Sequence, residues 1–321
     1  MSDSLRVGAH GAALGAAEAR QLADALTAGG GHEAEIVLLD SGADALRAAL
    51  RAGEFDAIVH AADTLPREGA EGLTVAAVPA REDARDVAVT RDGTPLHGLP
   101  IGATVGAGSA RRAAQARIRN PRAEVIAVDG DIEAQLQQVA DGAVDAVILA
   151  VADLNRLGPD PRGLVYEPLG LAEWPTTPGQ GALAVEARVD ASPAVRAALA
   201  ALDHLPTRLA VTAERAVSDE LAVDPAAPLA VHAVLEGELL RVRAIVYAPD
   251  GSSRVGADLT HPVGETETLD AGYIRSEGSG NGADAADGDH PLARAARAGS
   301  EVVHRLLERG AAELAPRESP R

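Results

Sequence analysis

Leu5-Arg6-Val7-Gly8-Ala9 begins the stretch that decides the fold, because it is the first of three short apolar runs separated by alanine-rich segments. The second and third runs are residues 35–39 and 57–60, and the segments between them, 14–28 and 43–52, predict helices. Strands that alternate with helices in this order predict a βαβαβ unit with a parallel sheet.

A second series of the same kind follows Pro100. Its predicted strands and helices are residues 101–105, 109–119, 123–128, 132–140 and 146–150. Two similar α/β lobes are the simplest explanation. We expect the chain to cross between them at the turn Thr90–Pro95 and again near 181–187, so that the two crossings form a hinge.

The pattern changes after Pro225, where apolar and polar residues alternate at 230–235 and 240–246 before a final predicted helix at 301–313. We therefore predict an α/β protein with two lobes, a cleft between them and a small α+β C-terminal domain. The predicted domains are residues 1–94 with 190–217, residues 98–188, and residues 218–321 with a mobile acidic loop at 264–289.

The composition excludes several classes of protein. A formal net charge of −19 opposes binding to nucleic acid and anionic lipid, and no block of basic residues interrupts it. One Trp, three Tyr and one Phe are too few for the aromatic platforms on which nucleic-acid bases stack. The absence of cysteine excludes disulfides, thiolate metal sites and cysteine nucleophiles.

We expect a cytoplasmic protein. The start, Met1 to Arg6, is not followed by the apolar region of a secretory signal, and no run approaches the ~18 apolar residues of a membrane span. We also expect a monomer with neither nucleic acid nor a membrane as partner.

The first glycine-rich turn, Gly8 to Gly15, follows a predicted strand, and Asp40 ends the next one, as in a dinucleotide-binding unit. The spacing is not the G-x-G-x-x-G of that motif. Two interpretations remain: a nicotinamide-dependent enzyme that uses the Gly8–Asp40 unit, or glycines that allow close packing of strand and helix.

The second glycine-rich turn, Gly102 to Gly108, leads into Ser109, Arg111 and Arg112 in the first turn of a predicted helix. Backbone N–H groups, a hydroxyl and two guanidinium groups at one place suit a carboxylate or a phosphate. The alternative is that the two arginines pair with nearby carboxylates of the protein. A Walker A loop is excluded, since the turn lacks lysine.

His60 ends an apolar strand, and Asp63 follows it, so a general base is one interpretation and a structural histidine is the other. The sequence has no His-x-x-x-His or His-Glu-x-x-His spacing, and we expect no metal. It also lacks the Gly-x-Ser-x-Gly motif of serine hydrolases.

Seven segments, taken in order, carry a more specific signal. Residues 55–66 are similar to D-x-x-V-H-S-x-K-D-L-P, and residues 178–186 are similar to G-Q-G-A-L-x-x-E. The other five are residues 81–86, 108–115, 129–132, 145–158 and 214–215. Together they resemble the hydroxymethylbilane synthase (porphobilinogen deaminase) family.

The resemblance implies a three-domain protein whose first two domains resemble periplasmic binding proteins. Members of the family join porphobilinogen units, with loss of ammonia, into a linear tetrapyrrole. The chain grows on a dipyrromethane that is linked through a thioether to a cysteine of the third domain. In the family, arginines bind the pyrrole carboxylates, and one Asp interacts with the pyrrole nitrogens and with the leaving amine.

Several of these groups are replaced here. Pro225 stands at the position of the cofactor cysteine, so we expect no covalent cofactor. Thr64 stands at the position of the catalytic Asp, and Asp63 stands at the position of the lysine before it. Other side chains replace three of the arginines: His10, Asp129 and Gln135. The predicted substrate- or anion-binding residues that remain are Ser109, Arg111, Arg112, Gln180, Gly181 and Arg188.

Two functions of different kinds follow from this pattern. The first is a pseudoenzyme of tetrapyrrole synthesis that binds a small carboxylate or pyrrole-type ligand, or regulates a protein partner of that pathway. The second is an active synthase that holds its primer without a covalent bond and uses Asp63 as a surrogate for the missing Asp.

Overall fold

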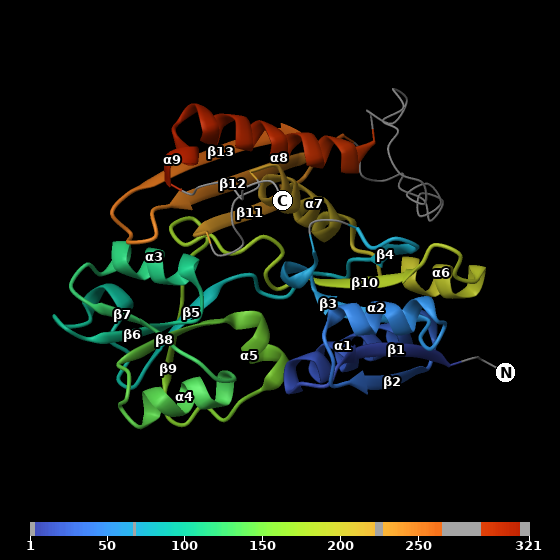
Figure 1. Cartoon of the computed structure of the whole chain (residues 1–321), viewed down its shortest axis with the longest axis horizontal. Coiled ribbons are helices and arrows are strands. Elements are labelled where there is room, and N and C mark those ends of the chain that lie inside the picture. Colours follow the sequence, from blue (N-terminus) through green and yellow to red (C-terminus); the bar gives the residue numbers. More distant parts are fainter. Residues whose placement is uncertain (1–3, 67–68, 222–226, 265–289, 315–321) are drawn as a thin grey trace.

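The structure, a computed structural model, describes residues 4–66, 69–221, 227–264 and 290–314. These residues form two α/β lobes side by side and a smaller body that lies across both (Figure 1). The predicted fold class, two α/β lobes with a small α+β C-terminal domain, is confirmed.

The first lobe contains a five-stranded sheet in the order β2-β1-β3-β10-β4. Its strands are β1 (Leu5–His10), β2 (Ala34–Leu39), β3 (Ala57–Ala61), β4 (Leu73–Ala77) and β10 (Leu183–Arg188). Strands β1, β2 and β3 are parallel, whereas β10 pairs antiparallel with β3 and β4. The helices of this lobe are α1 (Ala13–Gly30), α2 (Ala43–Arg51) and α6 (Pro193–Ala200), and η1 (Ala62–Thr64) is a short turn of 3-10 helix.

The second lobe contains a sheet of the same size in the order β7-β6-β8-β5-β9. Its strands are β5 (Asp86–Thr90), β6 (Thr104–Ala107), β7 (Glu124–Ala127), β8 (Ala146–Ala150) and β9 (Val165–Pro168). Strands β6, β7 and β8 are parallel, and β5 is antiparallel to β8 and β9. The helices are α3 (Ala110–Arg119), α4 (Ile132–Ala140) and α5 (Val151–Leu157), with a short 3-10 helix, η2 (Leu96–Gly98).

Each sheet contains one antiparallel strand, and this strand comes directly after the chain has crossed from the other lobe. Strand β5 lies in the second sheet and β10 in the first, so the chain crosses at residues 78–85 and 169–182. The predicted crossings at 90–95 and 181–187, and the domain limits built on them, are one strand too late. Sequence periodicity identifies a strand, but the sheet it joins depends on long-range pairing.

The third body is a meander of β11 (Leu229–Glu236), β12 (Leu239–Tyr247) and β13 (Arg254–Pro262), covered by helices. These helices are α7 (Leu205–Leu221), α8 (Pro291–Glu308) and α9 (Ala311–Leu314). Leu209 and Val217 of α7 pack with Val242 and Val302 in one buried cluster. Helix α7 thus belongs largely to this body, and the predicted limit at residue 217 falls inside it. The predicted loop at 264–289 lies, after Gly264, outside the described residues.

Capping residues set where the functional helix α3 begins. Ser109 has an extended backbone, and its side-chain oxygen accepts a hydrogen bond from the N–H of Arg112 at 3.2 Å. This cap places Arg111 and Arg112 in the first helical turn. Helix α5 of the second lobe packs against α1 of the first lobe (Figure 1), and these two helices form a junction between the lobes.

Candidate active site

The second lobe encloses a fully buried carboxylate, Asp86, at the start of β5. Arg111 Nη1 donates to its Oδ2, and Arg112 Nη2 donates to its Oδ1, both at 2.8 Å. Trp174 Nε1 and Gln180 Nε2 donate to it at 2.8 and 3.0 Å. Burial alone would raise the pKa of Asp86, but the charges of Arg111 and Arg112 outweigh burial and hold it well below its usual range.

The predicted anion site at Ser109, Arg111 and Arg112 is thus already filled by a carboxylate of the protein. Pairing with a nearby carboxylate was the alternative open from the sequence, and the structure has this arrangement, in a buried rather than solvated form. Arg111 is only 5% exposed, whereas the Arg112 side chain keeps 17% of its surface. Of the two arginines, Arg112 alone has appreciable surface for a ligand.

A second group of charges gathers where the two lobes meet, and we call it the junction cluster. It consists of Glu18 on α1, Asp63 in η1, Asp153 and Arg156 on α5, and Arg112 on α3. The charges of other members shift the pKa of each of the three carboxyl groups. The cluster combines three carboxyl groups with two guanidinium groups and joins elements of both lobes.

Arg156 connects the cluster to both lobes. Its Nε donates to Gln21 Oε1 of α1 at 2.9 Å, and its Nη2 donates to the carbonyl oxygen of Gly181 at 2.8 Å. Gly181 has φ of +83°, and a Cβ there would lie 2.9 Å from the carbonyl oxygen of Glu82. Only glycine lets the crossing segment pass this close. Gly181 therefore positions Arg156.

The carboxyl groups of the junction cluster hold protons more readily than free carboxyls do. Burial raises the pKa of Glu18 to about 7, with Arg156 opposing this and Asp153 and Asp63 adding to it. Glu18 is 6% exposed and accepts no hydrogen bond from the described residues. Desolvation by surrounding protein, and then Asp153, raise the pKa of Asp63, although its side chain remains open to solvent.

We expect Glu18→Gln to flatten the pH dependence of stability. The pKa of Glu18 rises from 4.5 to about 7 on folding, so the folded state binds the proton more tightly and the free energy of unfolding falls as pH rises through that interval. The loss is about 3 kcal/mol at most. Thermal melts of Glu18→Gln between pH 5 and 8 should show a gentler slope and a higher melting temperature at pH 8 than wild type.

Glu124→Gln, a change on an exposed strand position, is the control for the Glu18 experiment. It should follow the wild-type slope. Equal slopes for Glu18→Gln and wild type would contradict the burial of an ionisable Glu18. Part of the slope should persist in Glu18→Gln, because Asp63 and Asp153 also have raised pKa values.

Two residues that replace family side chains, Thr64 and His10, lie at the surface, and each forms a hydrogen bond with the backbone a few residues away. Thr64 is exposed, and its hydroxyl donates to the carbonyl oxygen of Ala61 at 2.8 Å. His10 is exposed, and its Nδ1 accepts from the N–H of Ala12 at 3.0 Å, which closes the turn before α1. Pro225 lies outside the described residues.

The remaining predicted positions are not brought into the junction cluster. Asp129 is exposed, and Gln135 Nε2 donates to the carbonyl oxygen of Gly130 at 2.9 Å. Arg188 Nη1 donates to the carbonyl oxygens of Leu50 and Phe55, both at 3.0 Å. Arg188 therefore joins elements of the first lobe instead of taking part in the predicted set with Arg111 and Arg112.

His60 belongs to a buried ion pair of the first lobe. Its Nε2 lies 3.1 Å from Glu186 Oε2, to which Arg47 Nε also donates at 2.8 Å. The pKa of Glu186 is lowered, because these hydrogen bonds and charges outweigh the burial that would raise it. The structural interpretation of His60 is thus confirmed.

The glycines of the first turn serve close packing. A Cβ on Gly8 would lie 2.6 Å from the ring of Phe55, and one on Gly11 would lie 2.0 Å from Asp40 Oδ1. Asp40, the candidate ribose ligand, is therefore packed against the turn itself. This geometry favours the packing interpretation over the nicotinamide one.

Four residues of these two groups were not predicted from the sequence: Glu18, Asp86, Asp153 and Arg156. Asp86 and Arg156 stand inside segments that resemble family motifs, so their motif positions could have revealed them. Asp153 also stands inside such a segment, 145–158, but at a position where the motif has no acid, and nothing in the sequence marks Glu18. Their proximity depends on how the lobes pack.

The described residues contain no group of three or more His, Cys, Asp or Glu that could hold a metal ion. Within the same residues, no helix has the length and apolar character needed to cross a membrane.

The sequence is similar to those of known proteins. A family model described as "Porphobilinogen deaminase, dipyromethane cofactor binding domain" matches residues 43–196. The porphobilinogen deaminase of Leifsonia xyli is 38% identical over 335 residues, and the alignment covers 98% of this chain and 94% of the Leifsonia protein. The porphobilinogen deaminase of Thermobifida fusca is 37% identical over 327 residues, and the alignment covers 96% of this chain and 95% of the Thermobifida protein. The methionine-binding protein MetQ aligns with a TM-score of 0.41 and 12% identity over 63% of this chain and 91% of its own.

Proposed function

The chain belongs to the porphobilinogen deaminase family of tetrapyrrole synthesis, and from this premise we propose that it condenses porphobilinogen, with release of ammonia, onto a pyrrole chain held without a covalent bond. The observation that carries the proposal is the exposed position of Asp63 in η1 at the junction of the two lobes, where the charges of Arg112 and Arg156 act on its carboxyl group.

Each condensation breaks the bond between the aminomethyl carbon and nitrogen of one porphobilinogen, and the electron pair of that bond leaves with ammonia. The carbon then bonds to the free α-carbon of the pyrrole chain, which releases its proton. A carboxyl group beside the reacting atoms can hold the cationic amine, stabilise positive charge on the pyrrole and accept the proton.

Asp63 supplies this carboxyl group in the proposal. It directly precedes Thr64, the position at which the family resemblance implies an Asp, and its side chain is open to solvent. Its raised pKa brings proton gain and loss closer to neutral pH, where a general acid or base is most effective. The charge of Asp63 also adds to the rise in the pKa of Glu18 to about 7, so the two carboxyl groups belong to one electrostatic cluster.

Arg112 supplies the positive charge for substrate carboxylates. Its Nε and Nη2 bind Asp86 Oδ1 at 3.2 and 2.8 Å, which fixes the guanidinium in place. Its charge lowers the pKa of Asp63 and of Asp153, so it lies near the same junction. A cation fixed in this way loses little entropy when a carboxylate binds it.

The covalent dipyrromethane of the family does not fit this chain. The resemblance implies attachment through a cysteine thioether, and the sequence contains no cysteine. No step of the proposed reaction therefore runs through a resident cofactor. The growing pyrrole chain is a second substrate, held by charge and shape.

A second candidate function is binding without turnover, as in a pseudoenzyme that regulates the pathway. The observation that favours it is the buried pairing of Arg111 and Arg112 with Asp86, which explains why both arginines are present without any role in substrate binding. The replacements at Thr64, His10 and Asp129 support the same candidate.

One assay separates the two candidates. Purified protein is incubated with porphobilinogen, with and without a preformed linear pyrrole chain, and ammonia release and uroporphyrin fluorescence after oxidation are recorded. Turnover that depends on the added chain supports the proposal. Stabilisation by porphobilinogen without ammonia release supports the second candidate, and a covalent pyrrole adduct in the intact mass would contradict non-covalent retention.

A further inference from the structure

We propose that a cavity between the second lobe and the third body is a binding site for a small anion with two or more negative charges, carried by carboxylate or phosphate groups. The cavity measures about 470 Å³, within the usual range for sites of small molecules. This proposal does not depend on the proposed reaction.

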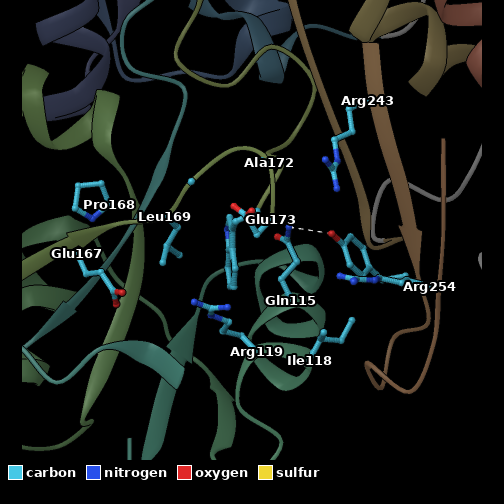
Figure 2. Close-up of a pocket in the computed structure, with 13 residues that line it drawn as sticks. Gln115, Ile118, Arg119, Glu167, Pro168, Leu169, Ala172, Glu173, Arg243 and Arg254 are labelled. Atoms are coloured by element: carbon cyan, nitrogen blue, oxygen red, sulfur yellow. Dashed lines mark hydrogen bonds between the residues drawn. The ribbon is translucent and has the colours of Figure 1, made fainter. Parts of the chain in front are cut away.

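Three arginines from separate elements line this cavity, which we call the arginine pocket. Arg119 is the last residue of α3, Arg243 lies on β12, and Arg254 begins β13. Figure 2 shows Arg243 and Arg254 on the third body and Arg119 on the helix across from them. Only the packing of the two bodies brings these three cations together.

Two of the three arginines have no ionic partner within the described part of the chain, and the third has one long ion pair. Neither Arg119 nor Arg254 forms an ion pair with a described carboxylate, and Arg243 lies 3.6 Å from Asp258 Oδ2. In a chain with a formal net charge of −19, such a gathering of positive charge is unexpected. Mutual repulsion among the three cations is relieved when an anion bridges them.

The two acidic residues of the lining do not neutralise these cations. Glu167 Oε2 accepts a hydrogen bond from the N–H of Leu96 at 3.0 Å, so it serves the backbone of η2. Glu173 is exposed. Neither forms an ion pair with an arginine of the pocket among the described residues. The guanidinium groups of Arg119 and Arg254 therefore remain available, and that of Arg243 has Asp258 as a partner at 3.6 Å.

The floor of the arginine pocket is rigid and polar. Gln115 Nε2 donates to the carbonyl oxygen of Pro175 at 2.8 Å and to the hydroxyl oxygen of Tyr247 at 3.1 Å (dashed in Figure 2). The Tyr247 hydroxyl thus accepts a hydrogen bond and keeps its own proton for a ligand. The charges of Arg254 and Arg243 both act on this phenol.

The same floor connects the pocket to the buried carboxylate Asp86. Gln115 Oε1 accepts from Arg111 Nη1 at 2.8 Å, and Trp174 Nε1 donates to Asp86 Oδ2 at 2.8 Å. Gln115 and Trp174 therefore line the pocket and belong to the Asp86 network. An anion that moves either residue alters the surroundings of Arg111.

The test uses Trp174, the single tryptophan of the sequence, which lines the pocket. Its fluorescence is followed while the whole protein is titrated with citrate, with pyrophosphate and, at matched ionic strength, with sodium chloride. We expect saturable changes with citrate, pyrophosphate or both, and none with chloride. Saturation by only one of the two assigns the charged group as carboxylate or phosphate. Absence of saturation with both would overturn the proposal.

Variants place the binding in the pocket. Arg119→Gln and Arg254→Gln should each weaken the anion about tenfold, as expected for one charge-assisted contact. Arg20→Gln, an exposed arginine of α1 in the first lobe, changes the net charge equally and should leave the affinity unchanged. Equal affinities in all three variants would show that the anion binds elsewhere and would overturn the proposal.

Discussion

Asp86→Asn is expected to lower the free energy of unfolding by about 3–5 kcal/mol, the usual cost of removing one partner from a buried ion pair. The carboxylate is fully buried and receives hydrogen bonds from Arg111, Arg112, Trp174 and Gln180. An asparagine has nearly the same shape but no charge. The buried guanidinium of Arg111 would then lack a counterion, and the second lobe would lose the centre of its polar network.

Urea unfolding followed by Trp174 fluorescence measures this effect, because Trp174 bonds directly to Asp86. The control is Asp258→Asn, which breaks the surface pair with Arg241 at 2.7 Å. Arg241 is half exposed, and such a pair contributes about 1 kcal/mol or less. If Asp86→Asn lowered the free energy of unfolding no more than Asp258→Asn does, the buried carboxylate could not be the centre of the polar network of the second lobe.

The buried pairing with Asp86 explains why Arg111 and Arg112 are present in this chain. Arg111 and Arg112 resemble substrate-binding residues in the sequence, yet both bind Asp86. Their presence therefore has a structural cause and does not by itself indicate a substrate. Arg112, which is near Asp63 and partly exposed, is the one that can serve both purposes.

The fold was largely predictable from local patterns. Apolar runs such as 5–9 and 146–150, separated by alanine-rich helices, identified both parallel sheets. Strands β5 and β10 were assigned to the wrong lobes, since β5 pairs with β8, beyond the predicted crossing at 90–95, and β10 pairs with β3, far back in the chain. No periodicity within five or six residues contains that information.

The candidate site was less predictable than the fold. Asp63 was identified through its motif, whereas Glu18 and Asp153 are joined to it only by the contact between α1 and α5. Arg188 was predicted as a binding residue because the resemblance places it among the carboxylate-binding arginines, but it bonds to the carbonyl oxygens of Leu50 and Phe55. A motif identifies residues that are close in sequence, whereas the residues of the junction cluster are brought together by packing between the two lobes.

Asp63→Asn is expected to reduce porphobilinogen turnover by about 10²–10⁴-fold, the usual contribution of a general acid or base. Asparagine keeps the size of the side chain but can neither accept the released proton nor balance a cationic amine. Initial rates of ammonia release at saturating porphobilinogen and pyrrole chain measure the loss. Asp24→Asn, an exposed acid on α1, is the control and should retain the wild-type rate.

A second change distinguishes a displaced carboxyl from a merely structural one. Thr64→Asp, added to Asp63→Asn, returns a carboxyl to the position that the family resemblance implies, one residue along the exposed turn η1. The double variant should recover part of the lost rate, whereas the Asp63→Asn variant alone should keep its wild-type melting temperature within a few degrees, since Asp63 is open to solvent. Recovery would mean that the reaction needs a carboxyl at this turn and tolerates its displacement by one residue. If Asp63→Asn turned over porphobilinogen as fast as wild type, the chemistry would have to be assigned to Glu18 or Asp153, the other carboxyl groups of the junction cluster.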